Sequence, residues 1–501
     1  MKITVFDGSG TIGGNKILVE EKNESLFLDF GMNFTSYSKY FEEFLTERNR
    51  RGIYDLWMLN LIPKKNIYRK DLIPNDLIGE IENREKIIVN GVLISHAHLD
   101  HVGNIALLNE NIPIIASPET LLILKTLSDI STRGLNMEIP FFKERVSDGN
   151  ILIPGDIKER QVFSTLKLPG EAIDFMQKIH TKSKDVEKKE IMSFENFQTH
   201  FEIKPYKVDH SIFGANGFII EGDISIAYTG DFRIHGMFAD DSKNFISQAK
   251  NVSILITEGT RVGRREDVNL SENDVYKNAK SIVEEAKSLV VADFSPRNFE
   301  RLISFKRIAD ETGRKLIITD KDADHLYSLD LYDNIDRLKG LLIYDERTGK
   351  KAEWKKFLKD SIDNEWILPN EIGKAQENFI ICFSFYDINE LLDIVPNSDS
   401  IYIYSSSEAF GEEEIFSFER LLNWIDHFGM RIEGIRKNGN RISFIKGLHA
   451  SGHISEEELY NAISEIDPDY IIPIHTEDPS WFNKNFEKKV INLENGMFFD
   501  L

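Results

Sequence analysis

The sequence predicts an α/β protein with at least two domains. At 501 residues the chain is too long for one ordinary hydrophobic core. Its first residues alternate short β-patterned runs with glycine turns, which indicates a meander of strands. From about residue 252, apolar runs alternate with amphipathic helical segments, and this rhythm is typical of a parallel sheet covered by helices.

The N-terminal third is predicted to be a β-rich body interrupted by two insertions. Residues 32–86 are charged, aromatic and compatible with helix, and a second long interval covers about 130–200. We expect the strands of this part at 3–6, 16–20, 26–30, 87–94, 208–209, 217–221 and 225–229.

The middle of the chain is predicted to be the parallel-sheet module. A helix over 298–312 has Gly313 in a stop position, and Ser271 with Asp274 forms a capping-box pattern at the start of another helix. We expect the strands of this module at 254–257, 289–294, 316–319, 341–344, 379–385 and 401–404.

Composition limits the class of partner. The chain carries 61 basic and 83 acidic residues, a net charge of −22, which argues against a protein that coats nucleic acid through a broad basic face. It leaves room for a nuclease, because a metal pair and a few arginines can hold phosphates inside an acidic molecule.

We expect a cytoplasmic protein with no membrane segment. Asp7 interrupts the apolar N-terminal run that a signal peptide needs, and no stretch of about 18 apolar residues occurs elsewhere. The single cysteine, Cys382, lies in an apolar run, where a buried free thiol is expected.

The chemistry is concentrated in the segment Ser95-His96-Ala97-His98-Leu99-Asp100-His101, directly after an apolar run. Three imidazoles and a carboxylate at the end of a strand can point toward two metal ions, and both ligand types suit zinc, iron or manganese. A histidine-rich surface loop is the alternative. The spacing favours a binuclear metal site.

Later residues can complete such a site. His210 and Asp231 each follow a predicted strand, and His453 and His475 lie near the end of the chain. Two ions of four to six coordination need about six protein ligands, with a carboxylate able to bridge them. These residues supply that number.

The order of these residues resembles a known superfamily. Asp29, the segment His96 to His101, His210 and Asp231 occur in the order of the four motifs of the metallo-β-lactamase fold. Leu255-Ile256-Thr257-Glu258-Gly259-Thr260 resembles motif A of the β-CASP group, His449-Ala450-Ser451-Gly452-His453 motif B, and Ile472-Pro473-Ile474-His475 motif C. The H-x-S-G-H form is most similar to the ribonuclease J branch.

This resemblance implies an αββα sandwich with an inserted β-CASP α/β parallel-sheet domain. The metallo-β-lactamase domain would comprise 1–236 and 430–501, with the insertions near 32–86 and 130–200, and the β-CASP domain 237–429. Thr476 departs from the pattern, since glycine is common there. His235 could compete as a ligand, and we interpret it as a bystander.

The resemblance also implies the ligand sets of two Zn²⁺ ions, with Mn²⁺ as an alternative. His96, His98 and His210 would hold one metal, Asp100, His101 and His475 the second, and Asp231 would bridge them. Asp29 would orient ligands without binding metal.

The implied reaction is hydrolysis of RNA phosphodiester bonds. Hydroxide formed at the metals would attack phosphorus in line, and an acid would protonate the departing ribose oxygen. Asp100, Glu258 and His453 are the expected catalytic residues, with His453 as the general acid.

Two loops are candidates for contacts to RNA. Ser451 and Gly452, with His449, precede a helix that Ser455 caps, and free N–H groups at such a position suit a phosphate. In the middle module, Phe294 and Arg297 follow a strand and could stack on a base and bind a phosphate. A plain helix cap, buried core and solvent surface are the alternatives.

Three classes of function remain open from the sequence. The first is a zinc-dependent ribonuclease, exonucleolytic or endonucleolytic, with RNA as partner and a homodimer as the expected assembly. The second is a DNA nuclease or a small-molecule phosphodiesterase or esterase on the same scaffold. The third is a catalytically idle binding subunit. His475 favours RNA, because the DNA-repair branch of the β-CASP group usually has valine there.

Overall fold

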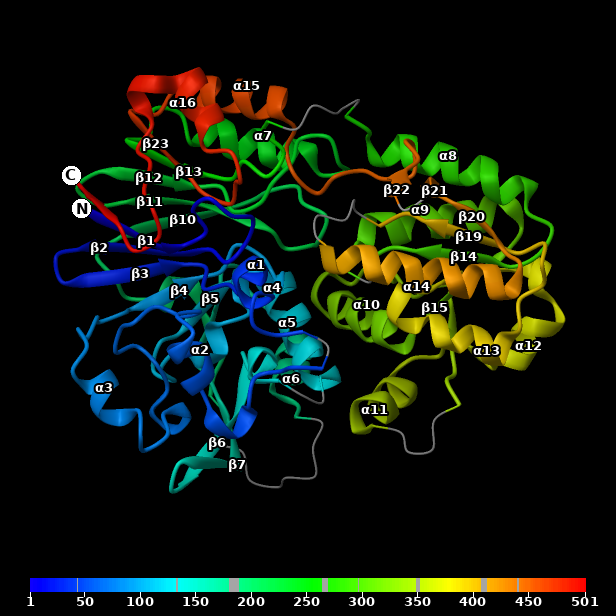
Figure 1. The fold of residues 1–501 in the computed structure, drawn as a ribbon, viewed down its shortest axis with the longest axis horizontal. Coiled ribbons are helices and arrows are strands. Elements are labelled where there is room, and N and C mark those ends of the chain that lie inside the picture. Colours follow the sequence, from blue (N-terminus) through cyan, green and yellow to red (C-terminus); the bar gives the residue numbers. More distant parts are fainter. Residues whose placement is uncertain are drawn as a thin grey trace.

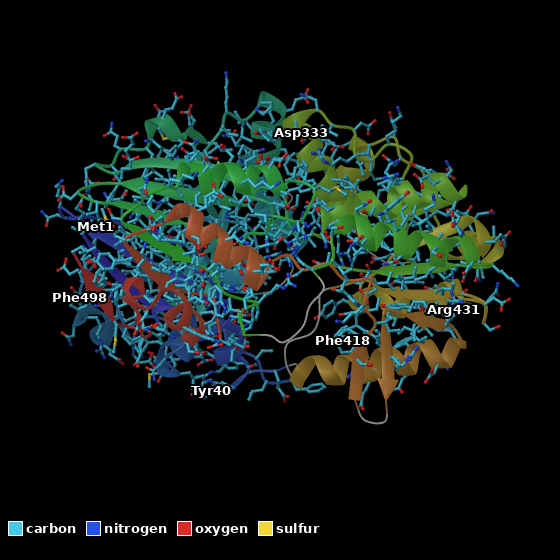
Figure 2. The ribbon with its side chains drawn as sticks, turned by 90° about the horizontal axis from the view of Figure 1, so that it is seen from above. Met1, Tyr40, Asp333, Phe418, Arg431 and Phe498 are labelled. Carbon is cyan, nitrogen blue, oxygen red and sulfur yellow. The ribbon has the colours of Figure 1, made fainter. Side chains whose placement is uncertain are left out.

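A computed structural model describes residues 1–42, 44–131, 134–179, 189–263, 269–295, 297–347, 352–406, 412–438 and 441–501. They form two bodies that lie side by side in Figure 1, a two-sheet body that holds both termini and a body built around a parallel sheet. In Figure 2, Met1 and Phe498 lie at one end of the molecule and Phe418 and Arg431 at the other.

The first sheet of the two-sheet body has eight strands and begins with the predicted meander. Its order is β24-β1-β2-β3-β4-β5-β8-β9, antiparallel from β24 to β3 and parallel from there to β9. The strands are β24 (Phe498–Asp500), β1 (Lys2–Asp7), β2 (Lys16–Glu21), β3 (Glu24–Leu28), β4 (Gly91–Leu93), β5 (Ile114–Ala116), β8 (Val162–Ser164) and β9 (Met192–Ser193).

The second sheet of this body has five strands in the order β10-β11-β12-β13-β23. Its strands are β10 (Glu202–Lys207), β11 (Asn216–Glu221), β12 (Ser225–Tyr228), β13 (Ile254–Thr257) and β23 (Tyr470–Pro473). The strand predicted at 208–209 is not found there, since β10 ends just before it at Lys207. Strand β23 lies more than 200 residues after β13 in the sequence and pairs with it in parallel.

Alternating burial packs the two sheets together. Ile254 and Ile256 point into a core shared with the first sheet, whereas Leu255 points outward into a second core under helices. That outer layer consists of α7 (Ala239–Gln248), α15 (Glu456–Ile466) and α16 (Ser480–Phe486), and α4 (Leu99–Val102) and α5 (Pro118–Ile130) pack on the other side of the first sheet. The layers run helix, sheet, sheet, helix.

The second body contains a seven-stranded, wholly parallel sheet in the order β17-β16-β15-β18-β14-β19-β20. Its strands are β14 (Val290–Asp293), β15 (Lys315–Ile318), β16 (Leu342–Tyr344), β17 (Trp366–Ile367), β18 (Phe379–Cys382), β19 (Ile401–Tyr404) and β20 (Arg431–Glu433). Its helices are α8 (Glu272–Glu285), α9 (Phe299–Thr312), α10 (Asp320–Asp333), α11 (Glu353–Ser361), α12 (Pro369–Lys374), α13 (Leu391–Ile394) and α14 (Glu412–Phe428).

The helix signals read from the sequence hold in this body. Ser271 and Asp274 form the capping box of α8, and Gly313 ends α9 in the left-handed conformation with φ +72°. A hairpin of β21 (Ile435–Asn438) and β22 (Arg441–Phe444) follows the sheet.

The boundaries between the two bodies differ from the prediction of 237–429 for the middle domain. Strand β13 and helix α7 fall inside that range, yet they pack in the two-sheet body, whereas β20 lies beyond it and pairs with β19. The reason is that the change from one body to the other occurs after β13, where the strand rhythm of the sequence continues without a break.

The two predicted insertions have different characters. Residues 32–86 form short helices, α1 (Phe34–Tyr37), α2 (Tyr54–Met58) and α3 (Ile78–Glu82), joined by irregular chain. The interval 130–200 supplies β8 and β9, the helix α6 (Gly170–Gln177) and a projecting hairpin of β6 (Phe141–Asp148) and β7 (Ile151–Glu159), visible at the bottom of Figure 1. Residues 132–133 and 180–188 of this interval lie outside the described ranges.

The two bodies share one continuous core. Buried side chains of α5 and α10 belong to the same apolar cluster, and Phe213 of the first body packs against Phe299 of α9 with ring centres 4.9 Å apart. Within the ranges described above, no helix is both long and apolar enough to cross a membrane.

Candidate metal centre

The predicted ligands come from loops that follow strands of both sheets in the two-sheet body. His96, His98 and His101 follow β4, Asp231 follows β12 and His475 follows β23. Because these strands run parallel to their neighbours, the loops at their carboxyl ends meet at one edge. Residues nearly 400 positions apart in sequence therefore face one another.

Three imidazoles form the first group of candidate ligands. His98 Nδ1 lies 2.9 Å from His96 Nε2 and 3.2 Å from His210 Nε2. Burial, together with the charge of neighbouring imidazoles, holds the pKa of His96 and of His210 well below the usual range, and burial next to Arg297 lowers the pKa of His98 to about 3. Neutral imidazoles are the form that binds metal.

The second group combines two carboxylates with two imidazoles. His101 Nε2 lies 3.0 Å from Asp231 Oδ2, and His475 Nε2 lies 3.2 Å from Asp100 Oδ2. Burial by itself would raise the pKa of both carboxyls, but the adjacent imidazoles outweigh it and lower the pKa of Asp100 and Asp231. Both carboxylates are thus held ionised, as metal ligands must be.

The donor set fits two divalent cations. Each group keeps one ligand atom per residue within 4.8 Å of the others. Asp231 Oδ1 is buried and accepts no hydrogen bond from the described residues, although a buried carboxylate oxygen is costly to leave unpaired. A bound cation would satisfy it, and the nitrogen and oxygen donors match zinc or manganese.

Asp29 supports the ligands from behind. Its Oδ2 lies 2.7 Å from His101 Nδ1 and accepts hydrogen bonds from Ser95 Oγ at 2.7 Å and from Tyr228 at 2.5 Å. The backbone of Asp29 is left-handed with φ +57°, a conformation that aspartate tolerates better than most residues. This position fits the expected orienting role.

Glu258 and His453 form a buried pair beside the second group. His453 Nδ1 lies 2.9 Å from Glu258 Oε2, and Glu258 Oε1 accepts the backbone N–H of Phe232 at 2.8 Å. Burial lowers the pKa of His453, but the carboxylates of Glu258 and Asp231 outweigh burial and leave it raised. The raised pKa favours the imidazolium form of His453, which can donate a proton.

The loop at 449–453 is anchored differently from the prediction. Both ring nitrogens of His449 face backbone carbonyls, Nδ1 that of Ser406 at 2.5 Å and Nε2 that of Gly434 at 3.0 Å. The carbonyl of Gly452 lies 2.6 Å from His210 Nδ1. His449 and Gly452 thus hold the loop and a candidate ligand in place, which leaves Ser451 as the residue with a side chain available for phosphate.

The two predicted RNA contacts from the parallel-sheet body, Arg297 and Phe294, lie in different surroundings. Arg297 reaches the first body, where its Nη1 lies 3.5 Å from the carbonyl of Ala97 among the candidate ligands. Phe294 is 5% exposed and stacks on Phe305 with ring centres 5.4 Å apart, so the ring belongs to the core. A base-stacking role for Phe294 is contradicted by this burial, because an apolar strand end points as readily inward as outward.

Sequence reasoning missed the residues that orient the imidazoles. Ser95 Oγ lies 3.0 Å from His96 Nδ1, and Thr260 Oγ1 lies 2.9 Å from His475 Nδ1. Their places in the sequence could have indicated this role, since Ser95 directly precedes the histidine segment and Thr260 is the last residue of the segment that resembles motif A. His235 lies outside the ligand groups that the described residues form and contacts Glu458 instead, as a bystander would.

Similarity to known proteins extends over nearly the whole chain. The chain is 25% identical over 495 residues to ribonuclease J of Mycoplasma genitalium, covering 95% of this chain and 68% of that protein. It is 21% identical to ribonuclease J of Methanocaldococcus jannaschii, covering 99% and 95%. No protein-family model matches the sequence.

A solved structure supports the fold. The crystal structure of a protein of unknown function from Enterococcus faecalis V583 superposes with a TM-score of 0.68 at 22% identity, covering 100% of this chain and 99% of that one. Fold and site together define the class, an α/β protein with a candidate binuclear metal centre at one strand edge of its two-sheet body. Within that class, the chain resembles proteins named ribonuclease J over 95% or more of its length.

Proposed function

We propose that the protein is a metal-dependent ribonuclease that hydrolyses RNA phosphodiester bonds. The observation that carries this proposal is the adjacency of two metal-ligand groups and the pair of Glu258 and His453, all at one strand edge. The relatives in bacteria and in an archaeon are named ribonuclease J, which favours RNA over DNA or a small ester.

The architecture is assigned accordingly. The two-sheet body is the metallo-β-lactamase sandwich, and the seven-stranded parallel body is the β-CASP insertion. Layer order, the place of the ligand loops and the return of the chain through β23 support this assignment. A homodimer and a cytoplasmic location stay predictions, to be checked by light scattering and by cell fractionation.

Two Zn²⁺ ions, with Mn²⁺ as the alternative, are the cofactors of the proposed enzyme. His96, His98 and His210 would hold one ion, Asp100, His101 and His475 the other, and Asp231 would bridge them. When bound, the ions supply Lewis acidity that acidifies water and neutralises phosphate oxygens.

The protein's own groups then move a proton and bind phosphates. His453, kept protonated by Glu258, would donate its proton to the ribose oxygen that leaves phosphorus. Arg297 lies close enough to the ligand segment to bind a phosphate next to the cleaved one. Ser451 retains its O–H as a donor, because its Oγ accepts the backbone N–H of His453 at 3.1 Å.

Cleavage of end-labelled RNA and DNA, each with a 5′ monophosphate or a 5′ hydroxyl, tests the proposal with zinc-loaded protein. We expect cleavage of RNA that Asp100→Ala abolishes, because that carboxylate belongs to the second ligand group. Equal cutting of DNA, or activity unchanged in the variant, would refute it. A metal content well below one ion per chain in the wild type would instead indicate a binding subunit.

A further inference from the structure

Five charged side chains form a buried ion chain where the two bodies meet. Arg233 contacts three carboxylates, Asp209 Oδ1 with Nε at 3.1 Å, Glu272 Oε1 with Nη1 at 3.4 Å and Glu300 Oε2 with Nη2 at 2.7 Å. Glu272 in turn binds Arg301 in two places, at 2.9 Å and 3.1 Å. Each of the five side chains is at most 2% exposed.

The ion chain begins at the metal centre. Asp209 directly precedes the candidate ligand His210, and Arg233 follows the bridging Asp231 by two residues. The backbones of Asp209 and Arg233 also pair as an isolated β-bridge, with the N–H of Arg233 donating to the carbonyl of Asp209 at 2.8 Å. A displacement of Arg233 would therefore be felt by both ligand loops.

The other end of the ion chain lies in the parallel-sheet body. Glu272 is the first residue of α8, and Glu300 and Arg301 lie in the first turn of α9. Arg301 Nη1 donates to Ser405 Oγ at 2.5 Å and to the carbonyl of Leu448 at 3.3 Å. The ion chain thus joins helices of one body to the metal-bearing loops of the other.

Between the two ends, the ion chain holds the segment that carries His453. The carbonyl of Ser451 accepts Arg233 Nη1 at 3.0 Å, and that of Leu448 accepts Arg301 and, at 2.7 Å, Ser405 Oγ. Residues 448–453 have no helix or strand of their own, and in Figure 1 the chain crosses there from the parallel-sheet body to α15. Outside contacts must therefore fix their shape.

The energetics favour a positioning role over one in stability. Removing five charged groups from water is costly, and an apolar contact would join the two bodies at least as firmly. Charged hydrogen bonds, however, demand one geometry, whereas apolar surfaces tolerate small shifts. An active site that needs an acid placed to within a fraction of an ångström benefits from the single geometry that charged hydrogen bonds impose.

We infer that the buried ion chain positions the segment 448–453, and with it His453, relative to the metal centre, so that Arg233, Glu272 and Arg301 are positioning residues. The inference rests on the proposed function for its catalytic consequence. Its structural part, that Glu272 couples the two bodies at this segment, stands without it.

Hydrogen–deuterium exchange of the zinc-loaded full chain tests the structural part. Glu272→Gln keeps the shape of the side chain and removes the charge that both arginines share. We expect exchange at the amides of 448–453 to rise by roughly tenfold or more, with metal content unchanged. Ser405→Ala, which removes one hydroxyl from the far end, should raise exchange at the same segment by less.

Asp71→Asn is the matched control. Asp71 also binds a fully buried arginine in two places, Arg69 at 3.0 Å and 2.6 Å, but it lies in the first insertion of the two-sheet body. Its substitution should leave exchange at 448–453 at the wild-type level. An equal rise in Asp71→Asn, or no rise in both Glu272→Gln and Ser405→Ala, would overturn the inference.

Two substrates separate positioning of the acid from damage to the metals. We expect Glu272→Gln to lower kcat on RNA by roughly 10-fold to 100-fold with little change in KM. Hydrolysis of bis(p-nitrophenyl) phosphate, whose leaving group needs no proton, should fall by less than about threefold. An equal loss on both substrates would contradict the role in positioning His453. A wild type that leaves RNA intact would sink the proposed function alone, because the exchange comparison uses no substrate.

Discussion

The two histidine-bearing segments of the site, 96–101 and 449–453, are built on opposite principles. The first follows β4 directly, and its last residues form the single turn α4, so local geometry brings its imidazoles together. The second has no regular structure, and its position depends on residues of both bodies. Under the proposed function, metal binding would depend on one body, whereas proton transfer from His453 would depend on how the two bodies meet.

Loss of the bridging carboxylate should have the largest effect. Asp231 belongs to the second ligand group and is the expected bridge to the first, so Asp231→Ala should empty at least one metal position. We expect cleavage of RNA to fall on the order of 10³-fold or more, because the lost Lewis acid is worth several kcal/mol. Elemental analysis and single-turnover rates measure both quantities. Full metal content in the variant would contradict the assignment.

A substitution in the second segment, 449–453, should impair catalysis without loss of metal. In His453→Ala we expect near-normal metal content and a chemical step slowed by roughly 10²-fold, the usual scale for loss of a general acid. A variant that loses metal would show that His453 is a ligand instead, and the contrast between the two segments would disappear.

Residues that orient the ligands of the first segment should affect the affinity for metal. Ser95 donates to Asp29 and lies beside His96, so Ser95→Ala should weaken metal binding by roughly 10-fold to 100-fold. Competition with a chelator measures the change. At saturating zinc the variant should recover its rate, and a rate that stays low would show that Ser95 does more than orient ligands.

The pair at the second segment predicts a pH effect. Glu258 raises the pKa of His453, and the acid must be protonated to work, so its activity is lost as pH rises through that pKa. Glu258→Gln removes the negative charge, which lowers the pKa of His453 and moves the alkaline limb of kcat to lower pH. A limb that stays in place would exclude His453 as the titrating acid.

The smallest effect on catalysis is expected at Phe294. Since its ring lies in the core, Phe294→Leu should change RNA cleavage by less than about twofold while lowering the free energy of unfolding by about 1–2 kcal/mol. Urea denaturation and steady-state kinetics report the two quantities. A large rise in KM for RNA with unchanged stability would reverse this interpretation.

The sequence predicted the parts of the molecule whose signals are local. The N-terminal meander, the strand 254–257 and the caps of α8 and α9 match their predicted positions closely, because alternation and capping act over a few residues. The histidine segment predicted the candidate metal centre in the same way, since its four candidate ligands fall within six positions.

Features set by distant contacts escaped prediction. Nothing near β13 shows that it lies between β12 and β23, and the sequence around Phe294 does not reveal that the ring points at Phe305. The roles of His449 and Gly452 depend on carbonyl groups and imidazoles brought together by the fold. The resemblance implied contacts to RNA for His449 and Gly452, whereas the fold gives them contacts within the protein.

The placement of His475 after β23 has a consequence for synthesis of the protein. Because β23 adds to the second sheet only after the whole parallel-sheet body has been made, a nascent chain carries an incomplete second ligand group until His475 has been synthesised. Until that point the candidate binuclear centre lacks one of its ligand loops, so any activity that depends on it would begin only late in synthesis.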